Sequence, residues 1–303
     1  FILAYILDPL VDWLEKKISR KAAIILVYIL LAAVISGSIY FALPVLSRDI
    51  ARIIEDIPQY ANVVQQMLQE LQIGYQRVPI PEGIRQVCDQ LIGGVEAAAL
   101  NLVQTVARGI LVLFSQTFNM ILAPVLSFYL LMEFDRIGRF CLELVPVRFR
   151  GELAEIGAEI NVIIKRFIRG NLLVALLIGV LAVLGLTLIG MDYSLLLGLL
   201  IGITNIIPYF GAIISGVPAV LIALLKSRWL ALYVLGLILV LQQLEGNIIT
   251  PKIIGDSVGL HPLMIILVLL IAGELFGVAG LLVAVPVTAI IKVLVTHALN
   301  HII

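Results

Sequence analysis

Long apolar segments alternate with short polar ones along the chain, and this pattern predicts membrane-spanning helices. Between Gly170 and Ile303 only eight side chains are charged, among runs of Leu, Ile, Val, Ala and Gly. A water-soluble domain of that length could not cover its surface with so few charges. We therefore expect lipid around this half of the chain. The continuous apolar segments that we interpret as spans are residues 22–46, 106–132, 172–189 and 229–244.

Two further apolar units, residues 193–225 and 263–291, have lengths that do not fit ordinary spans. The first is interrupted at Asn205–Gly211 and the second at Gly273–Gly277. Each half would reach only about 20–25 Å, which is short of the ~30 Å hydrocarbon core. We expect a repeated pair of re-entrant helical hairpins, because each unit also has a Phe-Gly at its break and a Val-Pro after it. A single kinked crossing by each unit is the alternative.

The predicted fold class is an all-α, polytopic membrane protein with these two broken units and an extramembrane helical hairpin. Residues 47–104 carry charges and apolar helical stripes, so we expect an extracytoplasmic helical segment that packs on a neighbouring subunit of a homo-oligomer or on the membrane surface. Residues 133–169 suit amphipathic helices on the cytoplasmic side. The expected segments are therefore 1–46 (N-terminal transmembrane helices, preceded by a missing segment), 47–104, 105–132 (a transmembrane helix), 133–169 and 170–303 (the transport core).

Composition excludes several classes of function. Hydrophobic residues make up 62% of the chain, the mean hydropathy is +1.15 and the formal net charge is zero, so nothing favours binding to nucleic acid. The chain has no G-x-x-x-x-G-K-[ST] and no H-E-x-x-H motif, and its two cysteines have no metal-site spacing. We expect no enzyme activity, no cofactor and no metal.

Polar residues at the breaks are the candidates for binding a solute or an ion. An unpaired carboxylate inside an apolar segment is costly unless it takes up a proton or a cation. Glu245 follows an apolar span, and Glu274 lies at a glycine-flanked turn. The alternative for Glu245 is a residue at a helix end, level with the lipid headgroups. The alternative for Asn205 and Thr204 is a cap for the broken helix. The complete set of candidates is Glu245, Asn247, Gln243, Glu274, Asn205 and Thr204.

Proline and glycine at the breaks are interpreted as backbone devices. Proline removes an amide donor, and glycine allows positive φ and close approach of helices, which a tight turn needs. These residues are Pro208, Gly211, Gly277 and Pro286.

Four motifs in order give the chain a resemblance to a known family. They are Pro208-Tyr-Phe-Gly211, Glu245-Gly-Asn-Ile-Ile-Thr-Pro251, Ser257-Val-Gly-Leu-His-Pro262 and Gly273-Glu-Leu-Phe-Gly-Val-Ala-Gly280. Together they resemble the bacterial autoinducer-2 exporter family of membrane transporters. The resemblance implies a multi-pass permease of the bacterial inner membrane. Its members are associated with export of autoinducer-2, a quorum-sensing signal, and others with sodium/proton antiport.

The expected function is secondary transport of a small polar molecule, with sodium or protons as possible coupling ions. Broken, repeated units favour a transporter. An oligomeric channel is the weaker alternative, because a pore would show a continuous polar stripe along a span and the sequence has none.

Overall fold

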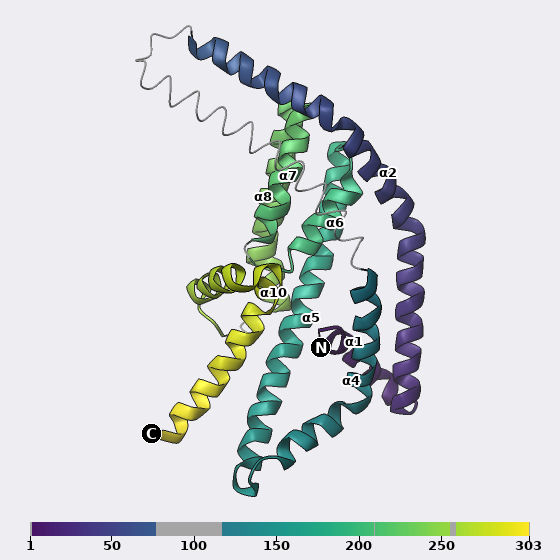
Figure 1. The fold of residues 1–303 in the computed structure, drawn as a ribbon, viewed down its shortest axis with the longest axis vertical. Helices are drawn as coiled ribbons and strands as arrows, with labels where there is room; N and C mark the ends of the chain where they lie inside the picture. Colours follow the sequence, from purple (N-terminus) through teal and green to yellow (C-terminus); the bar gives the residue numbers. More distant parts are fainter. Residues whose placement is uncertain (1, 77–116, 209, 255–258, 303) are drawn as a thin grey trace.

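Helices joined by short loops make up the part of the chain that the structure describes. The computed structural model describes residues 2–76, 117–208, 210–254 and 259–302 (Figure 1). The helices are α1 (Ile2–Glu15), α2 (Arg20–Gln76), α4 (Thr117–Glu143), α5 (Arg150–Ile189), α6 (Ser194–Thr204), α7 (Gly211–Lys226), α8 (Arg228–Leu244), α9 (Thr250–Ile253) and α10 (Pro262–Ile302). A 3₁₀ turn (Val147–Phe149) precedes α5, and a π-helical segment, η2 (Glu245–Ile249), joins α8 to α9.

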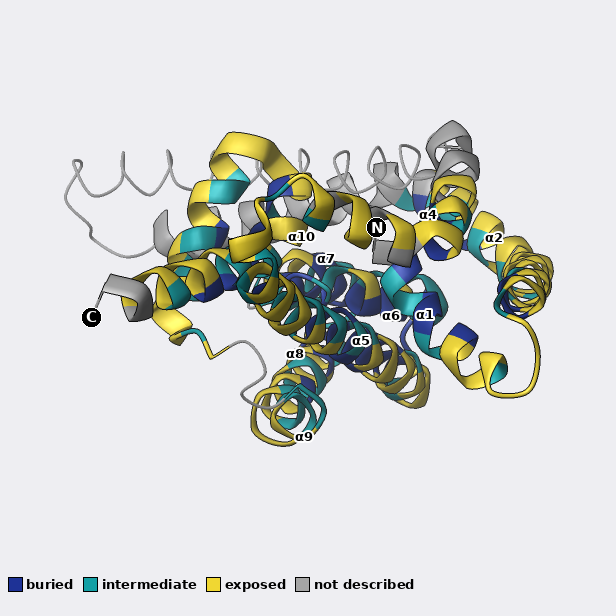
Figure 2. Cartoon of the chain, turned by 90° about the horizontal axis from the view of Figure 1, so that it is seen from below, coloured by how far each residue is buried: buried dark blue, intermediate teal, exposed yellow. Residues whose placement is uncertain are grey.

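Four of these helical segments are long and apolar enough to cross a membrane: Arg20–Ile53, Val147–Ile189, Arg228–Ile253 and Pro262–Leu299. Buried residues gather where α5, α6 and α7 meet, whereas α2 and α10 are largely exposed (Figure 2). The exposed side chains are themselves apolar, for example Phe41 at 76% and Leu188 at 87%. Surfaces of this kind need lipid or protein around them. The structure thus confirms an all-α, polytopic membrane protein.

Helix α5 is the centre of the core, and α6 packs against it in the opposite direction. Gly190 ends α5 with φ of 76°, a left-handed conformation that suits glycine, and the chain turns back there. Glycines at the interface bring the two backbones together, because a Cβ on Gly202 would lie 2.9 Å from the Cα of Gly179. The cluster around them includes Ile178, Ala182 and Leu197.

The first broken unit is a helical hairpin, which we call hairpin one (residues 192–226). Helices α6 and α7 form its arms, of 11 and 16 residues. The Nζ of Lys226 donates to Asp192 Oδ2 at 2.7 Å, so the start and the end of the unit lie together. The arms span about 16 and 24 Å, less than the hydrocarbon core of a bilayer. The predicted break after Asn205 is confirmed, and re-entry into a bilayer stays a prediction.

The second broken unit is also a hairpin, hairpin two (residues 259–292), formed mainly by α10. At Gly277, with φ of 60° and ψ of −143°, the helix breaks. Gly280 packs so closely on the earlier arm that a Cβ there would lie 2.0 Å from the carbonyl oxygen of Ala272. The Nζ of Lys292 donates to Gly259 O at 2.5 Å and thereby joins the two ends. The predicted break at Gly277 is therefore confirmed.

The two hairpins open at opposite ends of the segment between them. Hairpin one ends at Lys226, directly before α8 begins, whereas hairpin two begins at Gly259, after α9. The tip of hairpin one reaches hairpin two, because Ile207 and Phe210 belong to one apolar cluster with Leu269 and Val285. This is the inverted arrangement that the sequence predicts if both units are hairpins.

Two expected segment boundaries fall inside longer helices. Residues 150–189 form one helix, so the amphipathic segment 133–169 and the span that follows share an element. Gly170 lies inside this helix at a close contact, where a Cβ would lie 2.7 Å from Ile254 Cγ1. Likewise, α2 runs from Arg20 through residue 46 to Gln76. The remainder of the 47–104 segment and the start of the 105–132 helix lie outside the described residues.

Candidate ion and solute site

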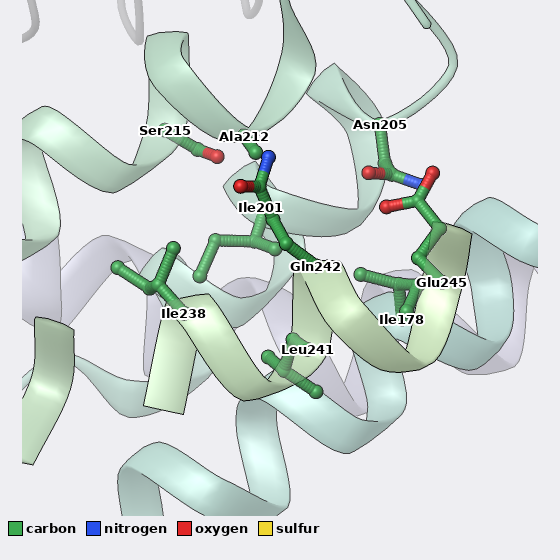
Figure 3. Close-up of a pocket in the computed structure, with 9 residues that line it drawn as sticks. All are labelled: Ile178, Ile201, Asn205, Ala212, Ser215, Ile238, Leu241, Gln242 and Glu245. Atoms are coloured by element: carbon green, nitrogen blue, oxygen red, sulfur yellow. The ribbon is translucent and has the colours of Figure 1, made fainter. Parts of the chain in front are cut away.

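Glu245 and Asn205 meet at the tip of hairpin one. Asn205 Nδ2 donates a hydrogen bond to Glu245 Oε1 at 3.0 Å. Asn205 follows the last residue of α6 and is 5% exposed, and Glu245 begins η2 after α8. Figure 3 shows the two side chains pointing toward each other from these separate elements. The bond therefore couples two points at which regular α-helix stops.

Thr204 and Asn171 hold the tip in place through the backbone. Thr204 Oγ1 lies 2.8 Å from Leu200 O and 2.9 Å from Gly211 O, so its hydroxyl serves the ends of α6 and α7. Asn171 Nδ2 on α5 donates to Ile206 O at 2.7 Å. Ile206 lies in the turn, so the bond from Asn171 satisfies a carbonyl without an intrahelical partner, whereas the Thr204 hydroxyl links a carbonyl within α6 to the first carbonyl of α7. Thr204 thus connects the two arms of hairpin one, and its role in binding an ion or a solute stays a prediction.

A small cavity adjoins the Asn205–Glu245 bond. The volume open to the centre of a water molecule is about 10 Å³, which is enough for about one water. Polar side chains enter it from three helical elements besides the tip: Ser215 from α7, Gln242 from α8 and Glu245 from η2 (Figure 3). The remaining lining residues are Ile178, Ile201, Ala212, Ile238 and Leu241. The cavity has the size of an ion or a single water.

The other polar candidates lie outside this cavity. Gln243 and Asn247 are exposed and bond to each other, with Asn247 Nδ2 donating to Gln243 Oε1 at 2.7 Å. Neighbouring residues on a helix point about 100° apart, so Gln243 faces away from the cavity that Gln242 lines. Glu274 lies at the turn of hairpin two, exposed beside Leu275 and Phe276. The structure thus brings Glu245 and Asn205 together and leaves Glu274 apart.

The four backbone candidates occupy the places that their residue types suggest. Pro208 lies in the turn between α6 and α7, and Gly211 begins α7. A Cβ on Gly211 would lie 2.3 Å from Thr204 O, so only glycine fits there without a shift of the backbone. Gly277 has the positive φ described above. Pro286 lies inside α10 and lines a larger apolar cavity beside α5.

Sequence reasoning missed a second polar cluster, in which Asp8 joins α1 to α5. Asp8 Oδ2 pairs with Lys165 Nζ, and Arg169 Nη2 lies 3.8 Å from the same oxygen. The Asp8 side chain is only 11% exposed. One signal could have found it, because a charged residue within the apolar run of residues 1–12 needs a partner. Ser215 gave no comparable signal, since one hydroxyl in an apolar helix can bond to the preceding turn, as it does to Gly211 O.

The Asn205–Glu245 pair can respond to a proton or a small cation. An ionised carboxylate accepts a stronger hydrogen bond than a neutral acid does. Protonation of Glu245 would weaken its bond to Asn205, and a cation at Oε1 would compete with the amide donor. Either event would weaken this contact between hairpin one and η2. Among the described residues, no group of three or more His, Cys, Asp or Glu side chains could hold a metal ion.

The long apolar helices and the two opposed hairpins define a multi-pass membrane protein of the transporter class. The family described as AI-2E family transporter matches residues 1–300 of the chain. The chain belongs to this family, which confirms the resemblance seen in its motifs.

Individual relatives align over almost the whole chain. It is 34% identical over 299 residues to "Putative transport protein YrrI" of Bacillus subtilis (strain 168), and the alignment covers 98% of this chain and 84% of the relative. It is 30% identical over 298 residues to "Putative transport protein YueF" of the same organism, covering 96% and 80%. It is 28% identical over 303 residues to "Putative permease PerM" of Escherichia coli (strain K12), covering 98% and 84%. A role in membrane transport follows from this membership.

Proposed function

We propose that the chain is an ion-coupled secondary transporter of the bacterial inner membrane, in which Glu245 and Asn205 form the coupling-ion site. The observation that carries the proposal is their 3.0 Å hydrogen bond at the meeting point of two helix breaks. Discontinuous helices whose ends face a buried site are how many secondary transporters bind ions. A π-helical segment such as η2 is also frequent at functional sites.

The size of the cavity separates the ion from the solute. A space of about one water admits a proton on Glu245 or a dehydrated sodium ion, and it excludes a sugar-sized molecule. The solute would therefore pass where the hairpins separate, after the Asn205–Glu245 bond has opened. We propose a small polar molecule as the solute, and export of autoinducer-2 is the form of this activity that the family description favours.

Sodium/proton antiport is the second candidate function. A single carboxylate that exchanges a proton for a sodium ion would be enough for it, and the ion-sized cavity beside Glu245 favours this candidate. An oligomeric channel is the weaker alternative.

The homo-oligomer itself stays a proposal, and multi-angle light scattering of the detergent-solubilised protein would test it by giving the protein mass.

A flux assay in proteoliposomes tests the proposal. The purified full chain is reconstituted, sodium and proton gradients are imposed separately, and uptake of autoinducer-2 and of related hydroxylated molecules is followed. A transporter accumulates its solute against the solute gradient only while an ion gradient is present. An antiporter exchanges sodium for protons, so a proton gradient drives sodium flux with no added solute. Leak down every gradient without accumulation would contradict both and would favour a channel.

A further inference from the structure

A side chain of the central helix holds the turn of hairpin one. Asn171 Nδ2 on α5 donates to Ile206 O at 2.7 Å, and Ile206 directly follows Asn205 in the sequence. The hydrogen bonds of Thr204 stay within hairpin one, whereas this bond joins the turn to another element. Asn171 is 8% exposed, so its amide has little water to bond in place of the carbonyl. The bond therefore fixes the place of Asn205 relative to α5.

The segment that carries Glu245 lies against the same stretch of α5. It consists of η2 and α9, and both of these contact α5. At its start, Glu245 lines the small cavity together with Ile178 of α5 (Figure 3). Just after its end, Ile254 lies so close to Gly170 that a Cβ there would be 2.7 Å from Ile254 Cγ1. Gly170 and Ile178 are about 12 Å apart along α5, so the segment follows this helix over about two turns.

Helix α5 is suited to support both segments because it is continuous. It runs from Arg150 to Ile189 without a break, through 40 residues. The elements that it supports are interrupted, since α6 ends at Thr204 and α8 ends at Leu244. Chain movements are usually absorbed at such element ends, whereas a continuous helix moves as one body. The relative movement of the two halves of the candidate site is therefore limited by their contacts with α5.

We propose that Asn171 is a positioning residue of the coupling-ion site. By holding the turn at Ile206 to α5, it keeps Asn205 at hydrogen-bond distance from Glu245. Asn171 does not line the ion-sized cavity, so it acts through the turn and not by contact with the ion. The inference rests on the proposed function, in which Glu245 binds the coupling ion.

The direction of the effect follows from the competition at Glu245. A proton or a cation at the carboxylate competes with the amide of Asn205 for the same oxygen. Any interaction that stabilises the arrangement in which Asn205 donates lowers the apparent affinity for the ion, because fewer molecules are competent to bind it. Loss of the Asn171 donor should therefore strengthen ion binding. The net contribution of one hydrogen bond corresponds to a change of about threefold to tenfold.

Ion-driven flux in proteoliposomes containing the full chain with Asn171→Leu tests the proposal. Leucine has nearly the shape of asparagine and lacks the donor. The half-saturating concentration of the ion that drives flux in the parent, sodium or protons, should fall by about threefold to tenfold. Maximal flux should stay within about threefold of the parent, whereas a merely damaged protein would lose flux without binding its ion more tightly. Asn161→Leu, the same substitution about 15 Å away along α5, is the control and should match the parent.

Two further variants complete the test. Asn171→Gln retains an amide donor on a longer side chain, so its half-saturating concentration should lie closer to that of the parent. Asn171→Ala replaces Asn171→Leu if that variant does not elute as the parent protein on gel filtration.

Two results would contradict the inference in distinguishable ways. If Glu245→Gln loses coupled flux while a folded variant without the Asn171 donor has an unchanged or raised half-saturating concentration, the proposed function stands and this inference is overturned. Unchanged ion-driven flux in Glu245→Gln would overturn both.

Discussion

Gly179 and Gly202 face each other across α5 and α6, so closely that a side chain on either would strike the other helix. A Cβ on Gly202 would lie 2.9 Å from the Cα of Gly179 and 3.1 Å from the carbonyl oxygen of Ala175. Small residues at such contacts allow helices to associate in lipid, where the hydrophobic effect does not hold them together. This contact fixes hairpin one against the central helix.

Gly202→Ala should therefore destabilise the protein by about 1–3 kcal/mol, the usual cost of overpacking a tight contact. Gly236→Ala on α8 is the matched control, because its Cβ would meet no atom within 4 Å and alanine favours a helix. The measurement is the midpoint of unfolding in a titration with sodium dodecyl sulfate. Equal midpoints for the two variants would show that the α5–α6 contact is looser than the structure describes.

Removal of the Asp8 carboxylate should destabilise the contact between α1 and α5. Asp8→Asn leaves Lys165 and Arg169 without their partner, and hydrogen bonds to charged groups contribute about 1.5–3 kcal/mol each. Adding Lys165→Met to this variant should restore part of the loss, because the uncompensated charge is removed. Arg136→Gln breaks the exposed pair with Glu133 and serves as the control, with an expected change below about 1 kcal/mol. The same unfolding titration measures all of these variants. Equal losses of stability for Asp8→Asn and Arg136→Gln would show that the ion pairs of Asp8 contribute no more than an exposed pair does.

Thiol labelling should show that both ends of hairpin one face the same side of the membrane. Asp192→Cys and Lys226→Cys, each in a background without Cys88 and Cys141, should react with an impermeant reagent from the outside of the cell. Lys292→Cys at the end of hairpin two should react only from the cytoplasm. The two bonds that join the ends of each hairpin imply that those ends share a side. The choice of sides follows from the basic cluster at residues 16–21, which the positive-inside rule places in the cytoplasm. Labelling of the two hairpin-one positions from opposite sides would show that the unit crosses the membrane once.

The two helix breaks could be predicted from the sequence because their causes are local. Pro208 cannot donate a backbone hydrogen bond, and Gly277 adopts a positive φ that other residues avoid. The expected boundary between residues 169 and 170 falls inside helix α5, in which Gly170 is a contact point. Its contact with Ile254 depends on tertiary packing that no local pattern reports.

The candidate site could be predicted only as a set of residues. Polar groups in apolar surroundings pointed to Asn205 and Glu245, which lie 40 positions apart and hydrogen-bond in the structure. The same reasoning included Gln243 and Asn247, which are exposed. Which face of a helix is buried depends on its neighbours, and η2 changes the rotation of the chain just where these residues lie. The place of Asp8 in an apolar run indicated that it needs a partner, but the partners could not be predicted, because they come from a distant helix.

The central claim is that Glu245 binds the coupling ion, and the most direct test is ion-gradient-driven flux in proteoliposomes containing Glu245→Gln. The amide keeps the shape of the side chain and removes its charge, so the variant should fold while it loses coupling. Glu155→Gln, an exposed carboxylate on α5, is the control and should transport as the parent does. We predict that Glu245→Gln loses at least about tenfold of the sodium-driven or proton-driven flux, whereas Glu155→Gln loses none. Flux through Glu245→Gln with unchanged dependence on pH and sodium would contradict the account, and Glu274 would then be the next carboxylate to test.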